Sequence, residues 1–320
     1  MKDGRIAKKV VIIAFNFGFA GRYVNGPGIC LYNLYNILKK HTSVDVKIFT
    51  KMRAHGQFNS DDIFSIDDKE YLSECIKNCD ILHHWSGLAN IYSNIIKFAN
   101  FCNKKVIIGP NVIDTVDFSK ENKFLSKINY DRVLLVNNRI KYRALDFYGI
   151  DSDLLSIFMV GPDLDLWSPS DICNEKILWK GNSAQGVKDV SFGVEVSKNL
   201  PQYDFDFVGH PTPYNYFKHI GPAKEYKLFF STSMSETMGM GLAEQWAAGI
   251  PSITHPKIYL HGENYITGII TDRSVSAYCD AIVEIMENPV LYKNLSLGAR
   301  KYMEDNFSHE SIASKYLSLL

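Results

Sequence analysis

The sequence of 320 residues lacks several features that would assign it to a membrane, a secretory pathway or a nucleic acid. It has no apolar run near the length of about 18 residues from which a membrane-spanning helix is inferred. No secretory signal precedes the first apolar run, which begins at Val10. The 35 basic and 35 acidic side chains balance, so net charge does not favour a nucleic-acid partner. We therefore expect a cytoplasmic globular protein.

Signatures of zinc and dinucleotide sites are also missing. The six cysteines are scattered, and the closest two, Cys75 and Cys79, do not follow a zinc-ligand spacing. Free thiols in a reducing compartment are the expected state of such residues. The G-x-G-x-x-G fingerprint is absent as well, so no dinucleotide cofactor is predicted.

Apolar runs that alternate with helical segments predict an α/β fold. Val10–Phe15 is nearly continuous in apolar residues, as in a strand buried on both faces of a parallel sheet. A Gly-rich loop ending at Gly28 follows, then a helical pattern over residues 29–40 and a second strand over 44–49. The alternation continues along the chain. With 46% hydrophobic residues over this length, two domains are expected.

The most informative stretch lies between residues 228 and 251. An apolar strand over 228–230 leads into a small polar loop and then a strong helix former over 242–248, which Gly249 and Pro251 end. Gly239 and Gly241 precede that helix, so its free N–H groups can receive an anion. Glu236 and Glu244 frame this site with seven residues between them.

Glycine-rich turns from strand to helix are common, and a glutamate on a helix is usually only solvated. The whole string is more specific. It resembles the signature of the retaining glycosyltransferases of family four, the glycosyl transferases group 1. The matching residues are Glu236, Gly239, Glu244, Ala248, Gly249 and Pro251, while Thr237 and Met238 replace the usual Gly-Phe.

The resemblance implies a GT-B architecture, in which two Rossmann-like domains with parallel sheets face each other across a cleft. An acceptor domain would cover residues 1–168 and a nucleotide-sugar donor domain residues 169–304. A final helix over 305–320 would cross back to the first domain. The implied reaction is a metal-independent hexosyl transfer from a nucleotide-diphosphate sugar to a glycan, a lipid-linked or a small-molecule acceptor, with retention at the anomeric carbon.

The resemblance also implies roles for residues of the second domain. Glu236 would bind the hydroxyls of the donor sugar and Glu244 those of the ribose, because carboxylates are strong acceptors for diols. The N–H groups of Gly239, Met240 and Gly241, together with Lys188 or Lys180, would stabilise the departing phosphate. A UDP-sugar is the commonest donor of the family and a GDP-sugar the next. No metal ion is expected, since the helix N-terminus would take its place.

Three further candidates lie at the ends of expected strands or in the loop that follows one, on the side where open α/β sheets place their ligands. Gly28 resembles the glycine turn that faces the donor from the first domain, and Gly209 ends a strand of the second. His84 ends a strand over 80–85 that matches the family only if one residue is deleted. The alternative is that one of His83 and His84 packs in the core and the other is solvated.

The sequence departs from the family at three positions. Asn182 stands at the position of an arginine and Gln185 at that of a lysine, the pair that holds the donor's diphosphate in relatives. Asn111 occupies the place of a first-domain histidine and cannot ionise. These departures leave open a catalytically silent GT-B subunit that supports an active partner. A GT-B nucleotide-sugar epimerase or phosphorylase is a further alternative.

A basic segment over residues 119–143 has two interpretations. It is either a solvated face or a surface for an anionic membrane or a phosphorylated acceptor, which would make the protein peripheral to the membrane. Its basic residues are Lys120, Lys123, Lys127, Arg132, Arg139, Lys141 and Arg143.

Overall fold

The computed structural model describes residues 7–17, 26–52, 61–85, 92–111, 128–211, 216–236, 239–258 and 264–320. The chain divides into two compact units. Unit 1 comprises Met1–Val160 and His309–Leu320, and unit 2 comprises Gly161–Ser308. The assignment of an acceptor role to one and a donor role to the other stays a prediction.

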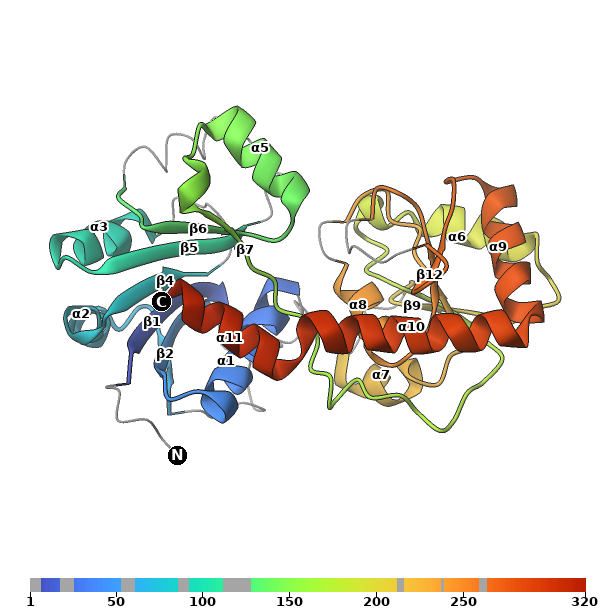
Figure 1. Ribbon diagram of the computed structural model, residues 1–320, viewed down its shortest axis with the longest axis horizontal. Helices are drawn as coiled ribbons and strands as arrows, with labels where there is room; N and C mark the ends of the chain where they lie inside the picture. Colours follow the sequence, from blue (N-terminus) through green and yellow to red (C-terminus); the bar gives the residue numbers. More distant parts are fainter. Residues whose placement is uncertain are drawn as a thin grey trace. The chain divides into compact units, whose positions relative to one another are not determined.

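The described residues of unit 1 form a parallel sheet of seven strands in the order β3-β2-β1-β4-β5-β6-β7 (Figure 1). The central strands are continuous apolar runs, and Val10, Ile12 and Ile13 are at most 1% exposed, as expected of strands covered on both faces. The strand bounds are β1 (Lys9–Asn16), β2 (Asp45–Met52), β3 (Ile63–Ser65), β4 (Ile81–His84), β5 (Lys105–Asn111), β6 (Arg132–Leu135) and β7 (Leu155–Ile157).

Helices cover this sheet, and one of them comes from the far end of the sequence. Figure 1 shows α11 beside α1, and the two helices are in contact. The helices are α1 (Gly26–His41), α2 (Lys69–Asn78), α3 (Ser93–Phe101), α5 (Asn138–Tyr148), η3 (Ser152–Leu154) and α11 (His309–Leu319). None of the helices in the described ranges has the length and apolarity that a membrane crossing requires.

Within the described residues, unit 2 holds a parallel sheet of five strands in the order β12-β11-β10-β8-β9. Its first strand, β8, lies between β9 and β10, so the strand order reverses beside β8. Such a switch point opens a crevice at the carboxyl ends of the strands, where α/β sheets bind ligands. The strand bounds are β8 (Ile177–Lys180), β9 (Phe205–Val208), β10 (Leu228–Phe230), β11 (Ser252–Thr254) and β12 (Gly268–Ile270).

The helices of unit 2 pack in pairs as well as on the sheet. Contacts join α8 to α10 and α6 to α9 (Figure 1). Their bounds are η4 (Gly186–Lys188), α6 (Val190–Lys198), α7 (Tyr216–Ala223), α8 (Met240–Ala247), α9 (Val275–Glu287) and α10 (Pro289–Phe307). Two parallel sheets with helices confirm the predicted α/β fold class.

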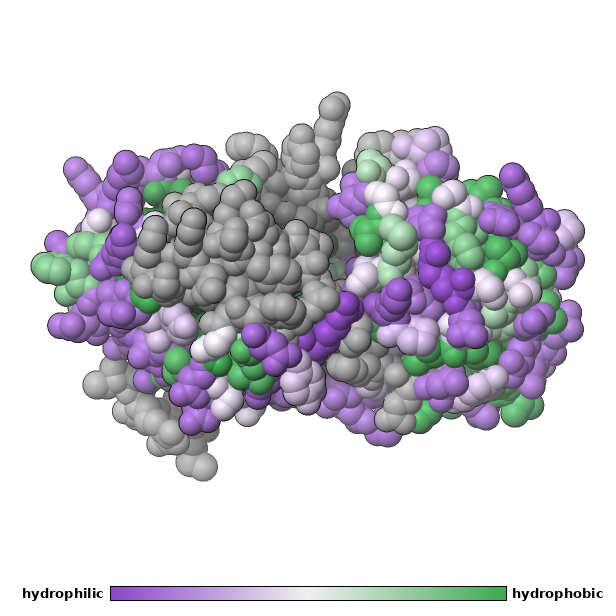
Figure 2. All heavy atoms as spheres, turned by 90° about the horizontal axis from the view of Figure 1, so that it is seen from above, coloured by the Kyte–Doolittle hydropathy of each residue, from purple (hydrophilic) through white to green (hydrophobic). Residues whose placement is uncertain are grey.

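Figure 2 displays a described part of unit 2 at its right, and this surface is not divided into a polar face and an apolar face. Polar and apolar residues are interspersed there. The most exposed large apolar residues of the chain, among those described, are Phe101 at 83% and Val290 at 71%. They belong to different units, and single exposed apolar side chains are normal on a protein surface.

Candidate functional site

The candidate site lies at the ends of the parallel strands β8 and β10. The loops that follow these two strands lie against each other and bring its residues together. The Met234 N–H donates to the Val187 carbonyl over 2.8 Å. The Thr232 hydroxyl donates to the Lys188 carbonyl, also over 2.8 Å, and accepts from the Trp179 indole N–H over 2.7 Å. These bonds bring Lys188 and Glu236, which are 48 residues apart, to one place.

Lys188 and Glu236 form an ion pair there. The side chains are 24% and 16% exposed, so the pair is partly open to solvent. The Ser233 hydroxyl donates to Oε1 of Glu236 over 2.8 Å, and the Glu236 N–H donates to the Lys257 carbonyl over 3.3 Å. Lys188 and Ser233 therefore both contact Oε1 of the carboxylate, and the side chain is still partly exposed.

Lys180 and Glu244 form a second ion pair, which is enclosed. Their side chains are 6% and 2% exposed, and Nζ lies 2.5 Å from Oε2. The same ammonium lies 4.6 Å from the ring centre of Trp167, a favourable cation–π position. Lys180 is the last residue of β8 and Glu244 lies within α8, so the pair joins the strand to the helix.

The N-terminus of α8 is formed by the glycines that the sequence singled out. Gly239 is the N-cap residue and has a φ of +68°, a conformation that favours glycine, and among the described residues no side-chain hydrogen bond caps the helix. Gly239, Met240 and Gly241 are partly exposed. A Cβ at Gly241 would lie 3.9 Å from the Lys180 carbonyl, which places this turn of the helix beside the end of β8.

Asn182 and Gln185, which replace the expected arginine and lysine, are both exposed. The side-chain oxygen Oδ1 of Asn182 accepts a hydrogen bond from the Ala184 N–H over 3.1 Å, so this side chain stabilises a turn. Gln185 is the N-cap residue directly before η4, and its side chain makes no capping hydrogen bond. The Ser183 N–H donates to the Gly209 carbonyl over 3.3 Å, which joins this loop to the end of β9.

His83 and His84 of unit 1 are both buried, at 0% and 1% exposure. The expectation that one of them is solvated is therefore wrong. His83 lies 2.7 Å from the Gly109 carbonyl through Nε2 and 2.9 Å from the Tyr316 hydroxyl through Nδ1. Because a carbonyl can only accept, Nε2 carries the proton and Nδ1 accepts from tyrosine.

Burial lowers the pKa of His83 to about 4 and that of His84 to about 3, so both rings are neutral near pH 7. The ring of His84 packs against Tyr92 at 5.7 Å between ring centres. Gly28 lies inside the first turn of α1, which begins at Gly26 and not at residue 29 as the periodicity suggested. The side chain of Asn111 is not among those described.

The basic segment lies partly outside the described residues, because residues 112–127 are not described. In the described part, the Arg132 guanidinium donates to the Ser156 hydroxyl over 2.8 Å and is partly buried. Membrane contact through this segment stays a prediction.

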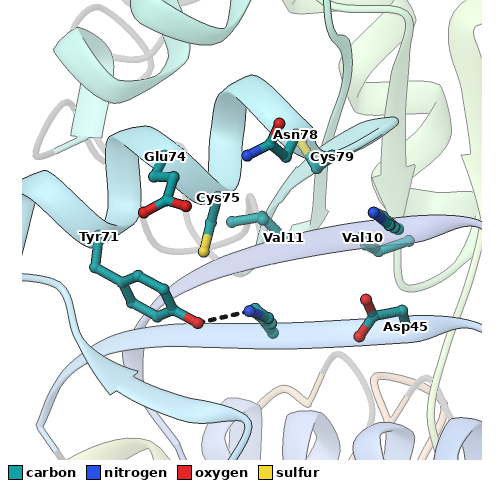
Figure 3. A pocket seen from close by; sticks show the side chains of 10 residues that line it. Val10, Val11, Asp45, Tyr71, Glu74, Cys75, Asn78 and Cys79 are labelled. Atoms are coloured by element: carbon teal, nitrogen blue, oxygen red, sulfur yellow. Dashed lines mark hydrogen bonds between the residues drawn. The ribbon is translucent and has the colours of Figure 1, made fainter.

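A groove of about 220 Å³ lies elsewhere in unit 1, at the amino ends of β1 and β2 beside α2 (Figure 3). Lys47, Tyr71 and Glu74 are among its lining residues, and the Lys47 ammonium donates to the Tyr71 hydroxyl over 2.6 Å. None of the predicted site residues lines it. The groove therefore lies at the amino ends of the strands, whereas α/β folds bind their ligands at the carboxyl ends.

Several residues that hold the site together were missed by sequence reasoning. Ser233, three residues before Glu236, and Asp189, directly before α6, carry signals that could have found them, since both residue types favour capping and loop contacts. Arg273 and His255, which also contact these loops, carry no local signal.

Comparisons with known proteins identify the fold. No protein-family model matches the chain, and no curated protein sequence matches it. Among solved structures, a glycosyltransferase from Rickettsia africae ESF-5 has 17% identity and a TM-score of 0.73, over 98% of this chain and 97% of the other. HepE of Anabaena, in complex with UDP and glucose, has 12% identity and a TM-score of 0.67, over 98% and 99%.

WaaG, a glycosyltransferase involved in lipopolysaccharide biosynthesis, has 11% identity and a TM-score of 0.62, over 97% of this chain and 99% of the other. Identities this low show the fold alone. That fold is the GT-B fold of glycosyltransferases, which confirms the architecture of two Rossmann-like units that the resemblance implied.

Proposed function

We propose that the chain is a retaining glycosyltransferase, which moves a sugar from a nucleotide-diphosphate sugar to an acceptor. The observation that carries the proposal is the partly open Lys188–Glu236 pair at the switch point of unit 2. The family-four string from Ser235 to Pro251 supports it. Further support comes from similar structures that hold UDP or UDP-glucose, which make a UDP-sugar the first donor to test.

In this proposal the ion pair is the arrangement before the donor binds. Donor binding separates its partners, because the leaving diphosphate attracts the Lys188 ammonium and the sugar hydroxyls donate to the Glu236 carboxylate. Ser233 keeps Glu236 in place while the lysine moves. Each charged contact made to the transition state would lower the barrier by roughly 2–4 kcal/mol.

The N-terminus of α8 supplies the remaining stabilisation of the phosphates. Backbone N–H groups at Gly239, Met240 and Gly241 would point to the diphosphate, and the helix dipole favours the negative charge. Lys188 replaces the arginine and lysine of relatives, whose positions hold Asn182 and Gln185. A divalent metal is not required for this arrangement.

Glu244 has a different part in this mechanism. Its carboxylate is 2% exposed and is engaged by Lys180, which favours a role in fixing α8 against β8. Direct binding of the ribose, as the resemblance implies, requires that a hydroxyl reach this enclosed group. His84 is likewise enclosed, so its proposed contact with substrate requires that the surroundings of the ring open.

One observation favours the second candidate, a silent GT-B subunit that supports an active partner. The Asn182 amide is used in a turn, and neither Asn182 nor Gln185 has a charge for the diphosphate. If Lys188 does not take over that role, the leaving group lacks the cation that it needs.

A thermal-shift screen against UDP, GDP, ADP and their sugars, with and without EDTA, tests the proposal. A ligand at a hundredfold excess over its Kd stabilises the folded state by roughly 2.7 kcal/mol, which gives a clear shift. We expect a saturable shift with one nucleotide, unchanged by EDTA.

Lys188→Met should weaken that shift, while Lys198→Met, which removes the same charge from an exposed position at the end of α6, should not. A wild-type protein that no nucleotide shifts would contradict the transferase and favour the silent subunit. A shift that EDTA abolishes would contradict the metal-free site.

A further inference from the structure

Three consecutive carbonyls lead from β10 towards Glu236, and each accepts a hydrogen bond from a different side chain. The Tyr278 hydroxyl donates to Ser231 over 2.8 Å, Arg273 donates to Thr232 over 3.2 Å, and Nε2 of His255 donates to Ser233 over 2.6 Å. The three donors come from α9 and from the segments after β12 and β11. This loop is therefore fixed residue by residue.

Arg273 differs from the other two donors because it contacts a second loop. The same terminal nitrogen that donates to Thr232 forms an ion pair with Asp189. Asp189 directly follows Lys188 and caps α6 by accepting from the Phe192 N–H over 3.3 Å. The guanidinium carbon also lies 4.5 Å from the ring centre of Phe192, a cation–π contact.

The contacts of Arg273 thus join the loop that carries Glu236 to the start of α6 beside Lys188. Thr232 adds a direct bond between these loops, through its hydroxyl and the Lys188 carbonyl. A guanidinium suits this place, because it keeps its charge at any accessible pH and its donors are fixed in one plane.

We propose that Arg273 is the positioning residue that holds Lys188 and Glu236 in register for transfer. The inference rests on the proposed function, since it assigns a purpose to that pair. Arg273 acts through the two loops and needs no contact with the substrate.

Loss of Arg273 should affect the chemical step more than the binding of the donor. The hydrogen bonds, ion pair and ring contact of Arg273 described above go to Thr232, Asp189 and Phe192, which lie outside α8, so the part of nucleotide binding that the N-terminus of α8 supplies should persist. A displacement of Lys188 or Glu236 by about 1 Å can cost up to roughly a hundredfold in rate. We expect Arg273→Met to lower kcat at least tenfold, while KM changes severalfold less.

The test has one arm that does not depend on activity. Acetylation of Lys188 by an excess of an amine-acylating reagent, followed by mass spectrometry, reports how firmly its ammonium is held, with exposed Lys198 as the internal reference. We expect the acetylation rate of Lys188, divided by that of Lys198, to rise severalfold in Arg273→Met. The ratio should return towards the wild-type value in Arg273→Lys. Asp189→Asn, which keeps a capping side chain but removes the charge, should give the same rise.

Tyr278→Phe is the matched control. It removes a buried hydrogen bond to the neighbouring carbonyl of Ser231 without touching Asp189, so it should lower stability and leave the Lys188 ratio unchanged. The second arm measures UDP release from UDP-glucose by the same variants.

An unchanged acetylation ratio in both Arg273→Met and Asp189→Asn overturns the inference, whether or not the protein turns over. The same holds if Tyr278→Phe changes the ratio as much as they do, because the effect is then one of general loosening. A raised ratio without nucleotide binding by the wild type supports the positioning contact and contradicts the proposed function alone.

Discussion

Two of the lysine–glutamate pairs of unit 2, Lys180–Glu244 and Lys188–Glu236, lie at the candidate site and differ in their access to water. Each pair joins the end of β8 or the loop after it to the segment around α8. The side chains of Lys180 and Glu244 are 6% and 2% exposed, whereas those of Lys188 and Glu236 are 24% and 16% exposed. The same two residue types can therefore serve as a structural joint in one place and as a binding group in another.

Burial explains why neither residue of the enclosed pair is well suited to leave its partner and bind a ligand instead. Removing a charge from water costs several kcal/mol, and the partner's charge and hydrogen bond offset that cost only while both are present. Lys180 and Glu244 meet this condition at 2.5 Å, with Trp167 over the ammonium. Lys188 and Glu236 keep part of their hydration, so each can accept a new partner at a smaller cost.

The largest effect should come from breaking the enclosed pair. Glu244→Ala leaves the Lys180 ammonium buried without its carboxylate, and we expect the free energy of unfolding to fall by about 3–5 kcal/mol. Urea unfolding followed by tryptophan fluorescence measures this, because Trp167, Trp179 and Trp246 all lie in unit 2.

The double variant Lys180→Met with Glu244→Leu tests the cause. It replaces both charges by apolar groups and should recover most of the lost stability. A double variant as unstable as Glu244→Ala would show that packing, and not the uncompensated charge, dominates at this position.

The next effect should come from the open pair and should appear in activity. Glu236→Gln keeps the size of the side chain and removes its charge, so we expect transfer to fall roughly a hundredfold. The free energy of unfolding should change by less than about 1 kcal/mol, as for other ion pairs that are partly hydrated. Steady-state kinetics and urea unfolding of the same preparation give both numbers.

Equal losses of stability in Glu236→Gln and Glu244→Ala would remove the distinction between the two pairs. Unchanged turnover in Glu236→Gln would remove the role proposed for the open pair.

The smallest effect extends the comparison to unit 1, where two rings are buried without charge. The pKa values of His83 and His84 are lowered to about 4 and about 3, against an ordinary value of 6.5, because burial disfavours the charged ring. The unfolded chain takes up protons as the pH falls below that ordinary value, whereas the folded chain does not. Stability is therefore fully present above pH 6.5 and is lost as the pH falls towards 4.

We expect the free energy of unfolding to fall by roughly 1–2 kcal/mol for each ring between pH 7 and pH 5. Urea unfolding at pH 7, 6 and 5 measures the slope. His84→Asn should reduce it, whereas His210→Asn, at an exposed position, should retain it. A slope that His84→Asn leaves unchanged would assign the acid sensitivity to other groups.

Much of the fold could be predicted from the sequence because local patterns determine it. The apolar run from Val10 corresponds to β1, and the strand expected over 228–230 is β10 as observed. The helix expected from residue 242 begins at Met240, directly after Gly239. Helix starts were less predictable where glycine and proline form the first turn, as at Gly26 and Pro27 of α1.

The pairings within the site could not be predicted, because they depend on the register of strands far apart in the sequence. The sequence pointed to both glutamates and both lysines. It did not show that Lys180 meets Glu244, 64 residues away, while Lys188 meets Glu236. Arg273 reaches Asp189 across 84 residues for the same reason. The burial of both histidines was hidden because β4 is covered on both faces.

The position of α11 in the chain has a consequence for the order of folding during synthesis. Residues 309–320 belong to unit 1 but are translated after the whole of unit 2. The Tyr316 hydroxyl, which lies beside the His83 ring, is 233 residues from it in sequence. On the ribosome, unit 2 can thus fold from a contiguous segment while unit 1 still lacks a helix. We infer that the nascent protein completes its second sheet unit first and its first sheet unit last.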